Sequence, residues 1–153
     1  MQERKELQMM VYEHRTQYYE TDQMGVIHHS NYVRWLESAR IWWMRQAGID
    51  YGEMEKDGIV SPVTAISCKY RSMVHFDDTV LIAIKIEKYN GVRLSLSYCV
   101  TDKESGELRM TGSSEHCFVN RDGRPVSLKK VYPDYDKAFV KELEKQTYDA
   151  AGV

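Results

Sequence analysis

The segment that most constrains the fold is an aromatic, helix-forming stretch over residues 30–48. Its apolar residues recur at steps of three and four, which places them on one face of an α-helix. Further apolar residues widen this face, so we expect the rest of the fold to enclose most of the helix. A side-chain oxygen of Ser30 or Asn31 can cap its start, and Gly48 can end it in a left-handed conformation. The face comprises Tyr32, Trp35, Leu36, Ala39, Trp42, Trp43 and Ala47, widened by Val33, Ile41 and Met44.

Four segments after this helix alternate apolar and polar residues with the two-residue period of β-strands. They cover residues 60–71, 80–87, 92–100 and 107–120. Asn90-Gly91 is typical of a type I′ turn between the second and third of these strands. Successive hairpins of this kind predict an antiparallel meander with one apolar face.

Shorter segments complete the expected domain. We expect a less regular strand over residues 9–19, a closing helix over residues 132–146, and frayed residues at 1–8. The elements together predict a single α+β domain over residues 1–153, in which one antiparallel sheet wraps the long helix. The outer strands of such a sheet leave open edges, which favour pairing into a dimer.

Composition excludes several classes of function. The formal net charge is −2, so a nucleic-acid partner is not expected. No apolar run approaches the roughly twenty residues that span a bilayer, so we expect no membrane span. Cys68, Cys99 and Cys117 are odd in number and lack CxxC spacing. They predict reduced thiols and neither a disulfide framework nor a zinc site. Since no N-terminal apolar run follows basic residues either, we expect a cytoplasmic protein.

Polar residues that could take part in a chemical reaction lie directly before the long helix. Asp22, Gly25, His28 and His29 fall within a turn or two of its start. Free backbone N–H groups and the positive end of the helix dipole gather there and would stabilise a carbonyl oxygen that becomes negative. A carboxylate beside this site could attack that carbonyl group or activate a water molecule. The alternative is that Asp22 only accepts hydrogen bonds from nearby backbone N–H groups.

The histidines are a second candidate for chemistry, as metal ligands. Adjacent His28 and His29 are poorly spaced for two ligands on one helix face. The other histidines, His14, His75 and His116, are scattered along the chain. We therefore expect no metal site.

One pattern in this region resembles a known family. Tyr19-Glu20-Thr21-Asp22, Gly25-Val26, His29 and Tyr32 resemble the signature of the 4-hydroxybenzoyl-CoA thioesterase family, and most closely the Tol-Pal-associated acyl-CoA thioesterases. The resemblance extends over residues 11–120 and implies a hotdog fold, in which a sheet wraps a long helix. It further implies an acyl-CoA thioesterase without a cofactor, coenzyme A being part of the substrate. Relatives of this kind work as dimers or tetramers, with the substrate at a subunit interface.

The resemblance also assigns roles to residues. Asp22 matches the nucleophile or general base, and the backbone N–H of His29 matches the group that polarises the thioester carbonyl. The His29 side chain matches a histidine that helps to bind or orient the substrate. For the acyl and thioester parts of the substrate we expect contacts with Gly25, Asn31, Tyr32 and Trp35, and for the phosphates of coenzyme A with Lys69, Arg71, Arg121 and Arg124. The competing interpretations are a helix cap for Asn31, a core position for Trp35, and plain solvation for the cations.

Two other functions remain open at this point. One is a hotdog hydratase or dehydratase, which would remove the conjugated chromophore of an enoyl-CoA. The other is a non-catalytic acyl-CoA binding or scaffold protein, which would bind tightly without releasing thiol. The acyl preference, with Gln23-Met24 and His28 departing from the family pattern, and the choice between dimer and tetramer are also open.

Overall fold

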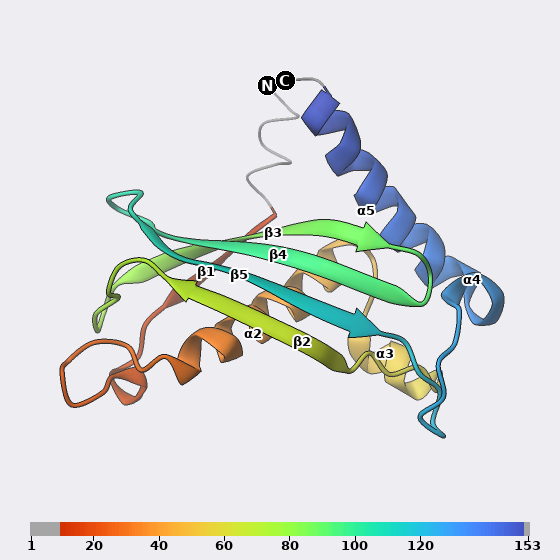
Figure 1. The fold of residues 1–153 in the computed structure, drawn as a ribbon, viewed down its shortest axis with the longest axis horizontal. Coiled ribbons are helices and arrows are strands. Elements are labelled where there is room, and N and C mark those ends of the chain that lie inside the picture. Colours follow the sequence, from red (N-terminus) through yellow and green to blue (C-terminus); the bar gives the residue numbers. More distant parts are fainter. Residues whose placement is uncertain (1–9, 152–153) are drawn as a thin grey trace. The chain divides into compact units, whose positions relative to one another are not determined.

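The structure, a computed structural model, describes the backbone of residues 10–151 and the side chains of residues 10–146 (Figure 1). The segment 1–8, for which we expected fraying, lies outside the described residues. In chain order the elements are β1 (Val11–Arg15), the 3-10 helix η1 (Tyr18–Glu20), α2 (Ser30–Gln46), α3 (Tyr51–Lys56), β2 (Val63–Tyr70), β3 (Thr79–Tyr89), β4 (Arg93–Asp102), β5 (Leu108–Cys117), α4 (Leu128–Val131) and α5 (Pro133–Ala151). The long helix, the four strands that follow it and the closing helix are therefore where the sequence predicts them.

The sheet is five-stranded and antiparallel, in the order β1-β3-β4-β5-β2. Strands β3, β4 and β5 form the predicted meander, but β2 lies beside β5 at an edge of the sheet and not beside β3. The N–H of Arg71, at the end of β2, donates to the carbonyl oxygen of Arg109 on β5 at 2.8 Å. The prediction of four consecutively paired strands is wrong for β2, because residues 71–78 form a long connection that lets the chain cross to the opposite side of the meander.

The turn between β3 and β4 also differs from its prediction. A type I′ turn requires positive φ at both central residues. Gly91 has φ of +91°, whereas the one non-glycine residue with positive φ in the described chain is Asp77. The side-chain oxygen of Asn90 instead accepts hydrogen bonds from the N–H groups of Val92 (2.9 Å) and Arg93 (2.7 Å). Asn90 closes the hairpin through its side chain, so the type I′ prediction is wrong.

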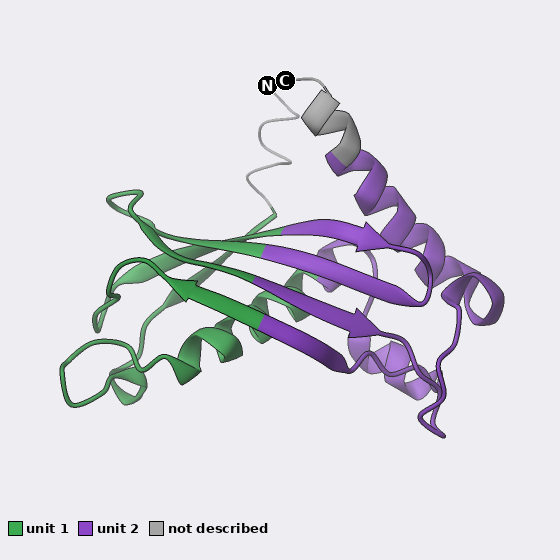
Figure 2. Ribbon diagram, in the orientation of Figure 1, with its two compact units in different colours: residues 1–43, 67–84, 98–112 green, residues 44–66, 85–97, 113–153 purple. Residues whose placement is uncertain are grey.

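The chain divides into two compact units (Figure 2). Unit 1 comprises residues 1–43, 67–84 and 98–112, and unit 2 comprises residues 44–66, 85–97 and 113–153. The alternation predicted for β3 and β4 is confirmed, because the apolar residues at every second position of both strands are buried. In unit 2, the Phe139 ring of α5 packs against Tyr89 and Phe118, with ring centroids 5.1 and 5.6 Å apart. Helix α2 and strands β2 to β5 run through both units, and the single-domain assignment stays a prediction.

Helix α2 ends as expected but begins differently. Gly48 has φ of +88°, and the N–H of Ile49 donates to Met44 at 2.8 Å, a left-handed helix end. At the start, neither Ser30 nor Asn31 caps the helix: the Asn31 amide donates to the carbonyl oxygen of Glu20 at 2.8 Å, and the Ser30 N–H donates to His28 Nδ1. The predicted side-chain caps are wrong because both residues already lie in the first turn.

The outer face of α2 is less enclosed than the apolar pattern suggests. Leu36, Ala39 and Trp43 are fully buried, whereas Val33 is 38 % exposed and Glu37 is exposed. The first part of the helix therefore buries one face within unit 1 and leaves the other accessible.

Glu20, at the end of η1, is the buried carboxylate that joins the first elements of unit 1. Its Oε1 accepts hydrogen bonds from the Gln17 N–H (2.8 Å) and lies 2.9 Å from His14 Nε2, and its Oε2 accepts from the Trp35 indole at 2.5 Å. Burial alone would raise the pKa of Glu20, but the hydrogen bonds from Trp35, His14 and Gln17 outweigh it and lower the pKa. This cluster also explains why the strand predicted to reach residue 19 ends at Arg15: the chain turns to place Glu20 against α2.

The contact of β5 with β2 gives a first testable prediction. A Cβ added to Gly112 on β5 would lie 2.9 Å from the carbonyl oxygen of Ser67 on β2, closer than real Cβ contacts allow. We expect Gly112→Ala to lower the free energy of unfolding by about 1–3 kcal/mol, because backbone atoms must move apart. Urea denaturation measures the change. Ser113→Ala, at the neighbouring exposed position, is the control and should shift it by no more than about 0.5 kcal/mol.

The lowered pKa of Glu20 predicts a pH-dependent stability. A carboxylate whose pKa is lower in the folded than in the unfolded protein stabilises the fold above its ordinary pKa of 4.5, and this contribution is lost as the pH falls through the folded value. The wild type should therefore exceed Glu20→Gln in free energy of unfolding near pH 7, and the gap should narrow as the pH falls below 4.5. Urea denaturation over a pH series measures both proteins. A gap that stays constant with pH would contradict the prediction.

Candidate functional site

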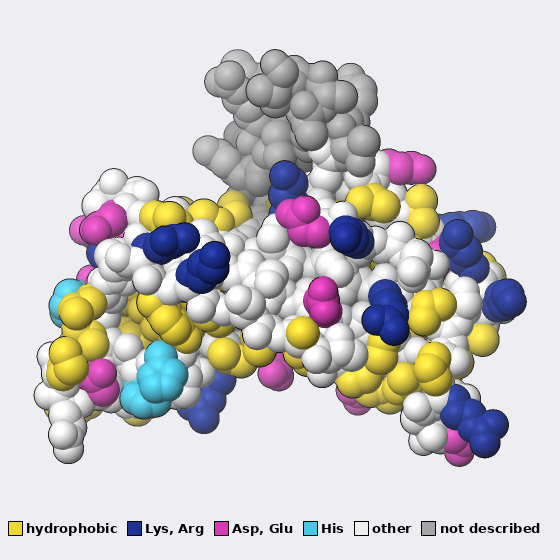
Figure 3. All heavy atoms as spheres, in the orientation of Figure 1, with side chains coloured by type: hydrophobic (Ala, Val, Ile, Leu, Met, Phe, Trp, Pro, Cys, Tyr) yellow, Lys and Arg dark blue, Asp and Glu magenta, His cyan; other side chains and the backbone are white. Residues whose placement is uncertain are grey.

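An open pocket of about 290 Å³ lies in unit 1, beside the start of α2. One wall is the segment that leads into the helix, and the other is the end of β2 with the connection that follows. The lining residues are Val26, Ile27, His29, Tyr32, Tyr70, Arg71, Ser72, Met73 and Val74. Figure 3 shows histidine side chains at the surface next to hydrophobic ones, and both His28 and His29 are exposed. The pocket thus combines mainly apolar walls with a few polar groups, which is typical of a small-molecule site.

Asp22 holds the loop next to this pocket. Its Oδ1 accepts hydrogen bonds from the N–H groups of Met24 (2.8 Å) and Val26 (3.3 Å). Its own N–H donates to the carbonyl oxygen of Val26 at 2.8 Å, and Gly25, with φ of +78°, completes the turn. No described residue donates a hydrogen bond to Asp22 Oδ2. One carboxylate oxygen therefore shapes the loop, as the simpler interpretation of Asp22 requires, while the other is available to a substrate or water.

His29 presents a backbone donor at the start of α2. Its carbonyl oxygen accepts hydrogen bonds from the Tyr32 N–H and the Tyr70 hydroxyl, each at 3.3 Å. Within the described part of the chain, no group accepts a hydrogen bond from the His29 N–H. The His29 ring stacks on His28 with centroids 4.2 Å apart and meets the edge of Tyr70 at 6.5 Å. A donor without a protein acceptor at a helix start that lines a pocket can bind a carbonyl oxygen.

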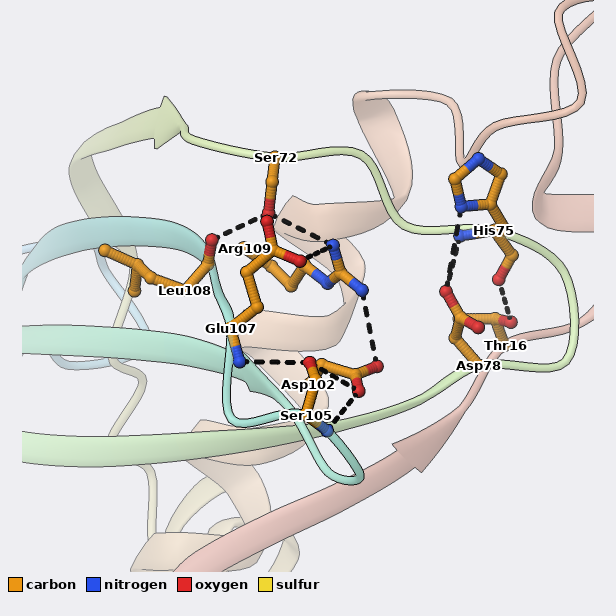
Figure 4. A network of polar contacts seen from close by, with 9 residues as sticks. All are labelled: Thr16, Ser72, His75, Asp78, Asp102, Ser105, Glu107, Leu108 and Arg109. Carbon is orange, nitrogen blue, oxygen red and sulfur yellow. Dashed lines mark hydrogen bonds and ion pairs between the residues drawn. The ribbon is translucent and has the colours of Figure 1, made fainter.

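The connection over residues 71–78 supplies the opposite wall through residues 71–74. Figure 4 shows the contacts that hold its end. At its end, the Thr16 hydroxyl donates to the carbonyl oxygen of His75 at 2.7 Å, and Asp78 Oδ2 accepts from the His75 N–H at 2.9 Å. At its middle, the carbonyl oxygen of Val74 accepts from the Ile27 N–H at 2.8 Å. The two walls of the pocket are therefore bonded directly to each other.

Arg109 on β5 holds the start of this connection (Figure 4). Its Nη1 donates to the Ser72 hydroxyl at 3.2 Å, and its Nη2 lies 3.5 Å from Asp102 Oδ1. The side chains of Arg109 and Asp102 are only 13 % and 11 % exposed. The hydrogen bond from the Ser105 N–H lowers the pKa of Asp102, which outweighs the effect of burial, and Arg109 lowers it further. The ion pair therefore keeps its charges and fixes Ser72, a residue of the pocket wall.

Tyr32 is a buried aromatic residue of the pocket lining. Its residue is 4 % exposed, and its ring packs against Trp35 (centroids 4.8 Å apart) and Tyr70 (5.0 Å). Burial, with the nearby Tyr70, raises the pKa of Tyr32 to about 12. The phenol therefore stays protonated near neutral pH and can donate a hydrogen bond.

The structure brings some of the predicted site residues together at the pocket. His29, Tyr32 and Arg71 line it, and Asp22 and Gly25 lie in the loop that immediately precedes its first lining residue. Their catalytic and substrate-binding roles stay predictions.

The remaining predicted site residues lie elsewhere. Asn31 and Trp35 are buried and bonded to Glu20, outside the set that lines the pocket. Lys69 is exposed on β2 and is also outside that set. Arg121 and Arg124 belong to unit 2, where Arg121 donates to the carbonyl oxygen of Lys56 at 2.8 Å. A role for these cations toward coenzyme A stays a prediction.

Three structural residues around the site were not assigned from the sequence. Glu20 lies within the quoted pattern, two residues before Asp22, and its place directly after Tyr18 and Tyr19 was the available signal. Arg109 and Asp102 give no comparable signal, because their pairing follows from the position of β5 beside β2. Among the residues that the structure describes, no group of three or more His, Cys, Asp or Glu could hold a metal ion, and no helix has the length and apolarity needed to cross a bilayer.

Comparisons with known proteins identify the family. Residues 16–142 match the family described as the thioesterase-like superfamily. YneP of Bacillus subtilis (strain 168), named as a provisional acyl-CoA thioesterase, is 35% identical over 125 residues, which are 81% of this chain and 90% of YneP.

Solved structures agree with this match. The DHNA-CoA thioesterase of Staphylococcus aureus has 35% sequence identity and a TM-score of 0.85, with 94% of each chain covered. A hypothetical protein of Staphylococcus aureus, solved in complex with CoA, has a TM-score of 0.76 over 87% of this chain and 84% of its own. At 17% identity, this last likeness shows the fold alone.

The order of strands, the helix against the sheet within unit 1 and the extent of the sequence match lead to one conclusion. The chain has the hotdog fold and belongs to the thioesterase-like superfamily.

Proposed function

We propose that this protein hydrolyses acyl-CoA thioesters to a carboxylic acid and free coenzyme A. Two observations carry the proposal: Asp22, in the loop that leads to the pocket, has a carboxylate oxygen with no described donor, and His29, whose N–H has no described acceptor, is one of the residues that line the pocket. The names of YneP and of the Staphylococcus aureus relative support the same reaction class. Neither a binding protein nor a hydratase accounts as directly for a carboxylate oxygen and a backbone N–H that both lack protein partners in the described chain and lie within eight residues of each other in sequence.

The reaction follows from these groups. The His29 N–H would polarise the thioester carbonyl and stabilise the oxygen as it becomes negative. As general base, Asp22 would take a proton from water while the hydroxyl oxygen adds to the carbonyl carbon; the C–S bond then breaks, and the thiolate of coenzyme A leaves and takes up the proton. As nucleophile, Asp22 would instead form an acyl anhydride, which water hydrolyses. The two routes give the same products.

The finer assignments belong to this proposal. The Tyr32 and Tyr70 rings favour a compact or aromatic acyl group, in line with the relative named a DHNA-CoA thioesterase. The resemblance to 4-hydroxybenzoyl-CoA and Tol-Pal-associated thioesterases stays a prediction, as does the cytoplasmic location. A thiol-release assay over short, long and aromatic acyl-CoAs separates these substrates.

We also propose that the protein works as a homo-oligomer built on β2. This strand lies at the edge of the sheet, and Val63, Ile66 and Tyr70 on it are 46 %, 40 % and 48 % exposed. An edge strand with exposed apolar residues is a template for pairing with a second copy. Because β2 ends at Tyr70 in the pocket wall, such a partner would lie beside the substrate.

Replacement of Asp22 tests the reaction. Asp22→Asn keeps an oxygen for the Met24 and Val26 N–H groups but removes the base, so we expect kcat to fall roughly 100-fold or more. Release of thiol from the best acyl-CoA of the panel measures the rate. Asp134→Asn, the same change at an exposed position of α5, should keep the wild-type rate.

Three outcomes would contradict the proposed function. A folded Asp22→Asn variant with the wild-type rate would remove Asp22 from the chemistry. Tight binding of acyl-CoA without thiol release by the wild type would indicate a binding protein. Loss of the enoyl-CoA chromophore without thiol release would indicate a hydratase.

Replacement of Ile66 tests the assembly. In a two-fold symmetric strand pair the same patch of both copies meets, so Ile66→Glu brings two negative charges together in an apolar interface. We expect light scattering to show an oligomer for the wild type and a lower mass for Ile66→Glu. Val131→Glu, an exposed apolar position on α4, is the control for the added charge. A monomeric wild type would overturn the proposed assembly.

A further inference from the structure

Glu20 is a buried ionisable group that the proposed chemistry does not use. Its residue is 5 % exposed, yet no positively charged Lys or Arg is among its hydrogen-bond partners in the described chain. Three donors surround its carboxylate: the Trp35 indole on α2, the Gln17 N–H before η1 and the His14 ring on β1. A carboxylate removed from water requires such compensation, and here each donor comes from a different element.

The backbone of Glu20 is also bonded to the segments on which the two candidate catalytic groups lie, the Asp22 carboxylate and the His29 N–H. Its carbonyl oxygen accepts hydrogen bonds from the Asn31 amide (2.8 Å) and from the His28 N–H (2.9 Å), on either side of His29. In the other direction, the following residue Thr21 pairs with Ile27, and Asp22 comes next. One residue is thus bonded to the segments that carry Asp22 and the His29 N–H.

We propose that Glu20 is a positioning residue, which sets the placement of the Asp22 carboxylate relative to the His29 N–H. This inference rests on the proposed function. Glu20 lies outside the set that lines the pocket, so it acts through the loop and the helix start and not through contact with the substrate. Small displacements of reacting groups are costly, since about 1 Å can lower a rate on the order of 100-fold.

The chemistry of the three donors requires an acceptor on both sides of the carboxylate. In Glu20→Gln one acceptor becomes an NH₂ group, which then faces either the Trp35 N–H or the Gln17 N–H, donor against donor. The side chain keeps its size but must shift away from one partner. Glu20→Gln therefore displaces this side chain and the segments bonded to it, with little change in side-chain volume.

Steady-state kinetics on the best acyl-CoA tests the role. We expect Glu20→Gln to lower kcat about 10-fold or more, with KM within about two-fold of wild type, because the residues that line the pocket are all retained and a small shift affects the reacting groups most. Glu13→Gln is the matched control: Glu13 lies on β1, pairs with Lys103 and is half exposed, and its loss should leave kcat unchanged.

Two double variants separate positioning from general loss of structure. In the Asp22→Asn background, adding Glu20→Gln should change the residual rate less than two-fold, because the group being positioned is already gone. Glu20→Gln with Trp35→Phe should be more active than Glu20→Gln alone, because the opposing indole N–H is removed. A loss of rate that is equal with and without Asp22 would overturn the role.

A measurement that does not depend on activity keeps the inference testable on its own. Hydrogen exchange of the His28 N–H, which donates to Glu20, should be at least several-fold faster in Glu20→Gln than in wild type, and unchanged in Glu13→Gln. If the wild type releases thiol from no acyl-CoA, the proposed function fails while this exchange still reports on the connection. If the wild type is active and Glu20→Gln matches it in kcat, the positioning role fails and the proposed function stands.

Discussion

The site depends on one physical requirement: a carboxylate buried among aromatic rings must be surrounded by hydrogen-bond donors. Glu20 meets it by drawing donors from β1, from the turn before η1 and from α2. Since the penalty for an uncompensated buried charge is large, these three elements cannot separate independently. This one residue therefore fixes the position of the Asp22 loop relative to the start of α2.

The second wall of the pocket is also held by buried charge, in this case by an ion pair. Arg109 and Asp102 form an almost buried ion pair, and Arg109 also donates a hydrogen bond to the hydroxyl of Ser72. Planar guanidinium groups suit this task because they hold several acceptors in a fixed geometry. The pocket is therefore lined in part by two segments without regular secondary structure, the one before α2 and the one after β2, and charged side chains hold each of them.

Periodicity alone predicts most elements of this fold. The apolar stripe of α2, the alternation in β3 and β4 and the closing helix are local patterns, and they appear where they are expected. The position of β2 is different, because an alternating strand pairs equally well with β3 or β5, and only the long connection decides. The predicted type I′ turn at Asn90 is wrong for a related reason. The Asn90 side chain accepts hydrogen bonds from the N–H groups of Val92 and Arg93, and a positive backbone φ at Asn90 is not needed.

The site is predictable in part for the same physical reasons. Asp22, Gly25 and His29 follow one another along the chain, so a short pattern captures them. Arg109 and Asp102 lie far from them in sequence, and their contact with the pocket wall requires knowledge of strand order. Asn31 and Trp35 have side chains turned to Glu20, which no linear spacing reveals.

The exposed edge of β2 has a consequence for how the protein would behave in a cell. An edge strand with exposed apolar side chains can pair with another strand, so a second copy of the chain or an unrelated strand competes for it according to concentration. Because its last residue, Tyr70, also borders the pocket, any partner that occupies this edge changes the entrance to the site. If two copies pair through β2, the activity would rise more steeply than the number of chains. At low expression most chains would be unpaired and would contribute little activity.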